Sequence, residues 1–191
     1  MKSYLTPEQY LEIERKAEFK SEYCQGEMFA MPRVRLAHVQ IVANAMRELG
    51  NQLAERPCQP LCSDMRVCVK PAGFYTYPDV LVVCGKPQFQ DESYDDTLLN
   101  PTVIVEVLTK SSEEYDRGPK FEQYRSLESL SEYLLISSWR VLAELFTREP
   151  DGTWSHCEKA SLEDSLHLQP VDCHLLLTDL YEKVEFPQPP S

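Results

Sequence analysis

The sequence lacks any apolar run near the roughly 20 residues that a membrane-spanning helix requires. Its first segment, MKSYLTPEQYLEIERK, is polar and does not resemble a signal peptide. There is also no internal repeat and no interdomain linker. These absences predict a cytoplasmic protein with one domain over residues 1–191. Its core is expected at about residues 20–148, followed by an extended tail at residues 183–191.

The cysteines do not follow the usual disulfide or zinc patterns, because their number is odd and no CxxC motif occurs. They are Cys24, Cys58, Cys62, Cys68, Cys84, Cys157 and Cys173. A free thiol inside an apolar strand, as at Cys68 and Cys84, behaves as a small hydrophobic group. Cys58 and Cys62 could bind a metal with His38, but their separation in an extended segment is a weak signal. We therefore expect reduced structural thiols, as is usual in the cytosol.

Basic residues are scarce, with 19 Lys and Arg against 31 Asp and Glu, which gives a net charge of -12. Because phosphate contacts supply most of the nonspecific affinity for nucleic acids, this charge argues against broad, sequence-independent coating of DNA. A local basic surface stays possible, since three clusters of basic residues are available. They contain Arg33, Arg35, Arg47, Lys110, Arg117, Lys120 and Arg125.

The residues that are present are typical of a globular protein, with 42% hydrophobic and 10% aromatic side chains. A helix is predicted from Pro7 to about residue 19, with Thr6 as its cap. Two short strands are expected over residues 22–31, around a Gln-Gly turn. A long helix follows at about residues 36–54. Its apolar face carries Ile41, Ala45, Leu49 and Leu53.

After Cys58 the hydrophobic period changes to two, which favours strands. Apolar Met65, Val67 and Val69 alternate there with polar Asp64, Arg66 and Lys70. Further strands are predicted at residues 77–83, 102–108, 132–136, 143–146 and 153–157, the last two joined by a hairpin at residues 150–152. Residues 85–100 are expected to form a loop, and a helix is expected to begin near Pro119.

A carboxylate inside the apolar strand 102–108 is conspicuous. Burying Glu106 costs several kcal/mol unless it is paired, protonated or bound to a metal. If this strand pairs with strand 77–83, Asp79 converges with Glu106 and supplies oxygen ligands for a hard divalent cation. Lys120 is the available cation, and helix spacing places Asp116, Lys120 and Tyr124 on one face.

Taken alone, each of these residues has a simpler interpretation. Asp79 would more often be a strand-end carboxylate that caps backbone amides. For Glu106, a structural ion pair and a functional site are equally favoured interpretations. Lys120 would most simply be an exposed helix residue. His156, His167 and His174 are predicted to lie at the surface.

Several longer motifs follow one another along nearly the whole chain. They are EYCQGEMFAMP, HVQIVANAMRELGNQL, SDMRV, YPDVLVVC, NPTVIVEVLTKSS and DRGPKFEQYRSLESLSEYLLI. In these motifs the chain resembles the bacterial Uma-type restriction endonuclease family, a domain of unknown function within the PD-(D/E)XK nuclease superfamily. The resemblance implies an α/β protein with a restriction-endonuclease-like core, in which helices flank a central mixed β-sheet. It also implies frequent assembly as a homodimer.

The resemblance assigns roles to residues position by position. Asp79 would be the aspartate of the PD motif, and Glu106 the acidic residue of the (D/E)XK strand. Lys120 would be a lysine displaced to the following helix, since Leu108 stands two residues after Glu106. Glu22 matches an early glutamate that supports the metal or its water; a hairpin salt bridge is its equally weighted alternative. His38 matches a family histidine, for which capping or a dimer interface is favoured over metal binding.

The leading hypothesis is a metal-dependent endonuclease that hydrolyses DNA phosphodiester bonds. Asp79 and Glu106 would bind Mg²⁺ or Mn²⁺, while Lys120 and Glu22 assist catalysis. Polar residues 109–112, where the family usually has Ser-Pro-Ser-Thr, could meet a phosphate through backbone amides. The alternative is a catalytically silent nuclease-fold module that recruits a protein or nucleic acid, motivated by the net charge of -12. A non-nuclease metal hydrolase is a third, weaker hypothesis.

Overall fold

Helices are short in this protein, with one exception. The computed structural model describes residues 4–31, 34–70 and 73–186. Its α-helices are α1 (Pro7–Glu14), α2 (Leu36–Leu53), α3 (Glu113–Tyr115), α4 (Phe121–Tyr124) and α5 (Leu177–Leu180), with a π-helical turn η2 (Asp116–Lys120) and a 3-10 turn η3 (Gln169–Val171). Within these described residues, every helix falls short of the length and apolar character needed to cross a membrane.

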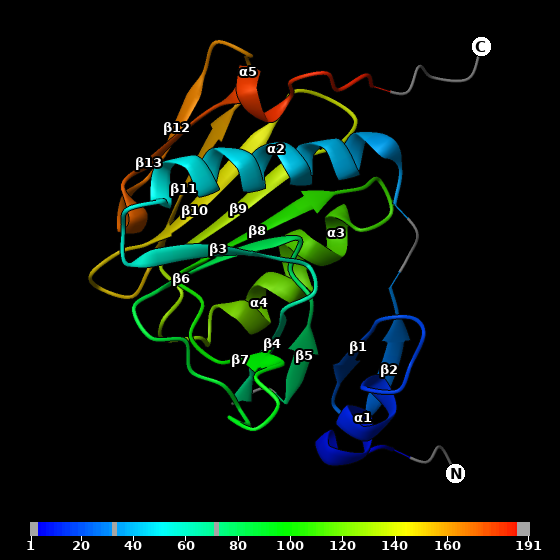
Figure 1. The fold of residues 1–191 in the computed structure, drawn as a ribbon. Helices are drawn as coiled ribbons and strands as arrows, with labels where there is room; N and C mark the ends of the chain where they lie inside the picture. Colours follow the sequence, from blue (N-terminus) through cyan, green and yellow to red (C-terminus); the bar gives the residue numbers. More distant parts are fainter. Residues whose placement is uncertain (1–3, 32–33, 71–72, 187–191) are drawn as a thin grey trace, which may run out of the picture.

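A six-stranded mixed sheet forms the centre of the fold, with strand order β11-β10-β9-β8-β6-β3. Its strands are β3 (Cys58–Cys62), β6 (Val80–Cys84), β8 (Val103–Leu108), β9 (Glu132–Ser137), β10 (Ala143–Arg148) and β11 (Trp154–Lys159). The sheet is mixed because β8 and β9 run parallel while the other neighbours are antiparallel. The predicted restriction-endonuclease-like α/β architecture, a mixed sheet flanked by helices, is confirmed (Figure 1).

A second sheet and a hairpin complete the strands. The second sheet has the order β2-β1-β5-β4-β7. Its members are β1 (Ser21–Cys24), β2 (Glu27–Ala30), β4 (Arg66–Val69), β5 (Phe74–Thr76) and β7 (Thr97–Leu98). The separate hairpin pairs β12 (Ser165–Leu168) with β13 (Cys173–Leu176). Sequence reasoning assigned no element to this hairpin.

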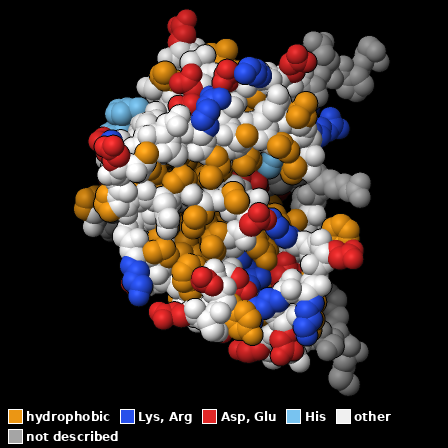
Figure 2. Space-filling view, in the orientation of Figure 1, with side chains coloured by type: hydrophobic (Ala, Val, Ile, Leu, Met, Phe, Trp, Pro, Cys, Tyr) orange, Lys and Arg blue, Asp and Glu red, His pale blue; other side chains and the backbone are white. Residues whose placement is uncertain are grey.

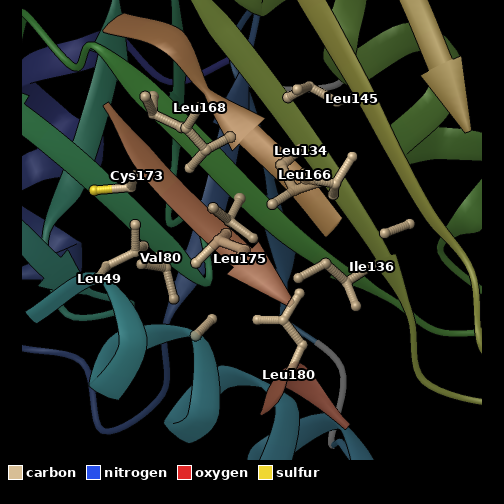
Figure 3. Close-up of a cluster of buried hydrophobic side chains, with 14 of the residues drawn as sticks. Leu49, Val80, Leu134, Ile136, Leu145, Leu166, Leu168, Cys173, Leu175 and Leu180 are labelled. Carbon is tan, nitrogen blue, oxygen red and sulfur yellow. The ribbon is translucent and has the colours of Figure 1, made fainter. Parts of the chain in front are cut away.

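Both faces of the six-stranded sheet are covered by apolar side chains. On one face, α2 packs together with β12, β13 and α5, and Figure 3 shows Leu49 of α2 close to Val80 and Leu175. On the other face, Phe121 and Tyr124 of α4 pack against alternate residues of β6, β8 and β9. Strand alternation explains this division, since successive side chains of a strand point to opposite faces. Glu106 therefore points to the face that carries α4.

The chain passes from one sheet to the other at residues 77–79. β5 ends at Thr76 in the five-stranded sheet, and β6 begins at Val80 in the six-stranded sheet. Pro78 lies between them, and proline has no amide hydrogen with which to bond a neighbouring strand. The predicted strand 77–83 therefore starts later than expected. As a result, Asp79 stands at the entrance of β6 rather than within it.

Other predicted helices agree with the structure in part. Thr6 forms the expected cap, with a reciprocal capping box to Gln9, but α1 ends at Glu14 instead of residue 19. The long helix is confirmed as α2, and the four residues of its predicted apolar face are buried. The helix expected to begin near Pro119 begins at Glu113. Its π-helical turn η2 holds Pro119 internally, so proline does not mark the start.

Strand predictions also needed corrections. Arg66, one of the polar residues of the predicted alternation, is only 3% exposed because it donates hydrogen bonds to Tyr77 and Thr97. The predicted loop at residues 85–100 contains the short strand β7. The predicted strands after residue 132 are confirmed as β9, β10 and β11. The tail expected at residues 183–191 lies outside the described residues from position 187 onward.

The expectation of reduced thiols is wrong for two cysteines. Cys58 and Cys84 form a disulfide, because β3 and β6 pair with these residues directly opposite each other. Sequence alone did not give this register, since the two cysteines are 26 positions apart. The bond also excludes the metal site considered for Cys58, Cys62 and His38. Cys24, Cys62, Cys68, Cys157 and Cys173 are free, as expected.

Candidate active site

A pocket opens where several distant segments meet. It is lined by the β1–β2 hairpin, the start of α2, the end of β8 and the segment α3–η2. Figure 1 shows these elements together on the right of the molecule, and Figure 2 shows a hollow between them. Its charged and imidazole side chains are Glu22, His38, Asp79, Glu106, Asp116 and Lys120. All four predicted catalytic residues, Glu22, Asp79, Glu106 and Lys120, therefore lie in one pocket.

Lys120 lies at the centre of the acidic residues. Its Nζ is 2.8 Å from Oε1 of Glu106, 3.2 Å from Oε1 of Glu22 and 3.5 Å from Oδ1 of Asp116. The Lys120 side chain is only 5% exposed, in contrast to the exposed helix lysine that the residue alone suggested. Asp116 and Lys120 begin and end the turn η2, so this turn directs both side chains into the pocket. π-helical turns of this kind are frequent at functional sites.

Glu106 is held by β8 and by the helix opposite. The antiparallel register pairs Val80 with Val105, so the next position places Asp79 across from Glu106. The expected pairing of these two strands is therefore confirmed. Tyr124, one helical turn after Lys120, donates a hydrogen bond of 2.9 Å to Oε1 of Glu106. The predicted common face of Asp116, Lys120 and Tyr124 is the face that meets this carboxylate.

Asp79 is fixed by two contacts. The backbone N–H of Val107 donates to its Oδ2 at 2.7 Å, and Nε2 of His38 lies 3.1 Å from the same oxygen. The hydrogen bond from Val107 matches the simpler interpretation of Asp79, a strand-end carboxylate that caps a backbone amide. Asp79 forms this bond within the pocket. His38 was expected to cap a helix or to lie at a dimer interface. It is instead buried in the pocket beside Asp79, because α2 places its first turn over the entrance of β6.

Glu22 meets Lys120 rather than a partner in its own hairpin. Its Oε1 accepts a hydrogen bond of 2.5 Å from Thr76, and its Oε2 accepts one of 3.2 Å from Tyr115. β1 pairs with β5, which brings Glu22 close to Thr76. These contacts, together with Lys120, hold the glutamate at the wall of the pocket. Thr76 and Tyr115 were missed by sequence reasoning, and only the sheet pairing and the fold of α3 reveal them.

The pocket carries excess negative charge, and this changes the acidity of its groups. Burial raises the pKa of Glu106 well above its usual range, and the negative charges of Asp116 and Asp79 add to the effect, against the opposing charge of Lys120. Burial likewise raises the pKa of Asp116. Burial alone would lower the pKa of Lys120, but the surrounding carboxylates outweigh it and raise that pKa further. Lys120 therefore stays cationic.

The donor set of the pocket fits a hard divalent cation. Four carboxylates face one ammonium group, so the positive charge of Lys120 does not balance them. The pKa of Glu106 and of Asp116 is raised mainly by burial, and the neighbouring carboxylates raise it further. Carboxylate oxygens are the ligands that Mg²⁺ and Mn²⁺ favour. Asp79 and Glu106 are the residues that could hold such an ion. Asp116 is an acidic neighbour, and the sequence predicted only that it shares a helix face with Lys120 and Tyr124.

The polar turn after β8 is partly bonded to itself. The N–H of Thr109 donates to Oγ of Ser112, and the N–H of Ser112 donates to Oγ1 of Thr109, both at 3.1 Å. Thr109 and Ser112 line the pocket. Their two amides are thus engaged within the turn. To bind a phosphate, as the sequence predicted, these two amides would have to release their hydrogen bonds to the side chains of Ser112 and Thr109.

The basic clusters contribute few free charges near the pocket. Arg117 pairs with Glu113 and Glu144, and Arg47 pairs with Glu48 and Glu182. Arg125 pairs with Glu122, while Arg33 lies outside the described residues. Arg35 and Lys110 are exposed, at the start of α2 and just after β8. Among the described residues of these clusters, Arg35 and Lys110 are the ones that could form a local basic surface beside the pocket.

A mixed sheet with acidic residues at the ends of two central strands defines a restriction-endonuclease-like protein. The family model Uma2, described as "Putative restriction endonuclease", matches residues 7–175. The chain belongs to this family. The resemblance of the motifs to the Uma-type family is therefore confirmed.

Relatives and a solved structure agree with this assignment. An uncharacterized protein of Synechocystis sp., sll1609, is 35% identical over 78% of this chain and 84% of its own length. A second, slr1290, is 31% identical over 95% of this chain and 94% of its own length. The crystal structure of "a putative nuclease belonging to DUF820" from Anabaena variabilis covers 93% of this chain and 97% of its own, with a TM-score of 0.76 and 15% identity. This last likeness concerns the fold alone.

Proposed function

We propose that the protein is a metal-dependent endonuclease that hydrolyses phosphodiester bonds of DNA. The observation that carries this proposal is the pocket in which Glu22, Asp79, Glu106 and Asp116 surround Lys120. Membership of the Uma2 family supports a nuclease-like activity. DNA as the substrate and a metal requirement are our inferences from the acidic pocket and from the family description.

Asp79 and Glu106 are proposed to hold Mg²⁺ or Mn²⁺. When bound, such an ion would polarise a phosphoryl oxygen as a Lewis acid. Val107 and His38 keep the Asp79 carboxylate in place, which reduces the cost of ordering it during the reaction. Tyr124 does the same for Glu106.

Lys120 is proposed to orient the attacking water or to stabilise the negative charge that develops on the phosphoryl group. Its ammonium group is held beside Glu106 and Glu22, at the place where substrate phosphate would enter the pocket. Because the site is largely buried, a fixed cation stabilises developing charge more strongly than it would in water. Glu22 assists by positioning Lys120 and by accepting a proton from the water.

The substrate would approach over an apolar rim. Phe29 is 50% exposed and Val34 is 45% exposed at the mouth of the pocket, and Arg35 and Lys110 lie nearby. With a net charge of -12, affinity for DNA would depend on these few local contacts. We also propose that the protein is a cytoplasmic homodimer, and the family resemblance supports the dimer. Sedimentation would test the dimer.

Plasmid nicking across a series of divalent metals tests the activity. Wild type is expected to nick DNA with Mg²⁺ or Mn²⁺, and Glu106→Gln is expected to lose this activity while keeping its fold. Glu132→Gln is a matched control, since Glu132 is also a buried strand glutamate but lies outside the pocket. Equal nicking by wild type and Glu106→Gln would contradict the assignment. Activity on small phosphoesters alone would instead indicate a non-nuclease hydrolase.

A catalytically silent binding module is the second candidate, favoured by the overall negative charge and by the engagement of Lys120 with carboxylates. Calorimetric titration with Mg²⁺ or Mn²⁺ separates the two. The nuclease proposal expects binding that disappears in Asp79→Asn and Glu106→Gln. A silent module would show no binding that depends on these residues.

A further inference from the structure

Two histidines face each other on the surface of the β12–β13 hairpin. The antiparallel register places His167 directly opposite His174. Their inward neighbours Leu166, Leu168 and Leu175 are buried, so strand alternation turns both imidazoles to solvent. The two rings are parallel, with centroids 4.1 Å apart and 1° between their planes. Figure 2 shows histidine side chains at the left edge, where Figure 1 places β13.

Asp172 adds a carboxylate to this pair. It occupies the left-handed turn before β13, with φ 47° and ψ 47°, and its Oδ1 lies 3.1 Å from Nε2 of His167. One ligand atom from each of the three residues lies within 4.8 Å of the others. A tetrahedral zinc site with bonds of about 2.0–2.2 Å needs donor atoms roughly 3.3–3.6 Å apart. The side chains of His167 and Asp172 are 42% and 71% exposed, so small rotations can close this gap.

We propose that His167, Asp172 and His174 form a surface binding site for Zn²⁺, with the fourth position open to water. Two imidazole nitrogens and one carboxylate suit a borderline cation such as Zn²⁺. The pocket around Lys120 instead offers carboxylates, which suit hard cations. The two sites therefore differ in ligand chemistry as well as in the elements that build them.

Residues from the end of α2 and just beyond it hold this site in shape. Arg56 donates to the carbonyl oxygens of Val171 and Asp172, at 2.6 Å and 2.7 Å, and lies 3.5 Å from Oδ2 of Asp172. The other carboxylate oxygen, Oδ1, is the one turned to His167. Gln52 hydrogen-bonds both the N–H and the carbonyl of His174, each at 2.8 Å. Such outer contacts fix ligands in advance and lower the cost of binding.

Zinc at this position would link β12, β13 and the turn between them. β12 and β13 cover the core beneath α2, through the buried residues Leu166, Leu168 and Leu175. A ligand that binds only the folded protein stabilises it by mass action. Zn²⁺ at about 100 times its Kd is therefore expected to raise the Tm by roughly 5–10 °C.

Titration of the full-length protein with Zn²⁺ alone, after removal of metal with EDTA, tests the site. Exposed thiols also bind zinc, so every variant is made in a Cys62→Ser, Cys157→Ser background. Loss of an outer-shell partner typically weakens metal binding about 10–100-fold, so His167→Ala and His174→Ala should each weaken it at least roughly tenfold. His156→Ala is the matched control, because His156 is exposed on β11. It should bind Zn²⁺ as the parent does.

Glu106→Gln distinguishes this site from the pocket. It should keep the Zn²⁺ affinity and the rise in Tm, whether or not the proposed nuclease activity exists. Equal affinity in the parent, His167→Ala and His174→Ala would overturn the proposal. So would zinc binding that Glu106→Gln abolishes and His167→Ala retains. If circular dichroism shows that His174→Ala does not fold, the exposed His167→Gln variant carries the same test.

Discussion

Two clusters of buried and partly buried charged side chains differ in their surroundings. In the pocket, four carboxylates face Lys120. Where α1 meets β4, Arg15 and Arg66 bind Asp96, and Arg66 donates to the hydroxyl of Tyr77. Tyr77 in turn donates to Glu14. The second cluster thus contains two guanidinium groups and two carboxylates, while the first has four carboxylates and one ammonium group.

The acidity of the carboxylates follows from their burial and from their charged partners. Against the opposing effect of burial, hydrogen bonds from Arg15 and Thr97 and the charge of Arg66 lower the pKa of Asp96 to about 2. Burial raises the pKa of Glu106 well above normal, although Lys120 lies 2.8 Å away. A balanced cluster stabilises the fold with ionised groups. In a cluster with more carboxylates than cationic groups, binding a metal cation stabilises the ionised carboxylates. This property is expected of a metal site.

The largest expected effect is on the balanced cluster. Arg66→Met removes the buried cation between Asp96 and Tyr77, so Asp96 loses one of its two guanidinium partners and the Tyr77 hydroxyl loses its donor. We expect the free energy of unfolding to fall by about 3–5 kcal/mol, because one partner of a buried ion pair is lost. Urea denaturation measures this change. Arg140→Met, at an exposed position, should change it by less than about 0.5 kcal/mol. A loss below about 1 kcal/mol for Arg66→Met would contradict the comparison.

Glu132 is another buried carboxylate, and its hydrogen-bond partners are a backbone amide and a hydroxyl. Burial raises the pKa of Glu132 to about 7, against hydrogen bonds from the N–H of Gln169 and from Thr147. The folded pKa exceeds the unfolded value of 4.5, so its stabilising contribution is complete below about pH 4.5 and is lost as the pH rises through about 7. Glu132→Gln should therefore be more stable than wild type by about 2–3 kcal/mol at about pH 8.

Urea midpoints across the pH range check this prediction for Glu132. The gain should shrink to less than about 0.5 kcal/mol at about pH 4.5, because Glu132 is then neutral in the folded state and only half ionised in the unfolded state. The exposed Glu158→Gln variant serves as the control and should show no such trend. A gain of the same size at both pH values would point to packing instead of ionisation.

Asp96 is expected to show the opposite dependence on pH, with a smaller effect. Its pKa of about 2 lies below the reference value of 3.8, so its contribution is present above about pH 3.8 and is lost as the pH falls through 2. Its side chain is 29% exposed, so solvent screens part of the interaction. Asp96→Asn should cost about 1–2 kcal/mol at neutral pH and less as the pH approaches 2. A cost that grows on acidification would contradict the assignment.

Much of the fold could be predicted from hydrophobic periodicity. The 3.6-residue period at α2 and the apolar runs at β6, β8 and β9 depend on local sequence, and these elements appear close to where they were expected. The disulfide and the burial of Arg66 could not be predicted in this way. Both depend on pairing: Cys58 lies opposite Cys84, and Arg66 meets Thr97, 31 residues later. Such contacts exist only once the sheets have formed.

The candidate site could likewise be predicted only in part, because some of its residues are identified by local sequence and others by the fold. Glu106 stood out because it is the only charged residue of an apolar strand, and the order of motifs then selected Asp79, Glu22 and Lys120. Their meeting in one pocket agrees with that selection, while their catalytic roles stay predictions. The place of Asp116 and His38 could not be predicted, because it depends on the π-helical turn η2 and on how α2 crosses the entrance of β6.

The smallest expected change in stability concerns Glu106, the carboxylate with the closest contact to Lys120. Its folded pKa is raised, so the ionised form destabilises the folded state at neutral pH, and glutamine imitates the protonated form. Lys120 keeps Glu22 and Asp116 as partners after Glu106→Gln. We therefore expect the free energy of unfolding, measured in urea without divalent metal, to stay within about 1 kcal/mol of wild type or to rise. A loss above about 2 kcal/mol would mean that Glu106 acts as a structural ion-pair partner, like Asp96, and that the two clusters do not differ as argued.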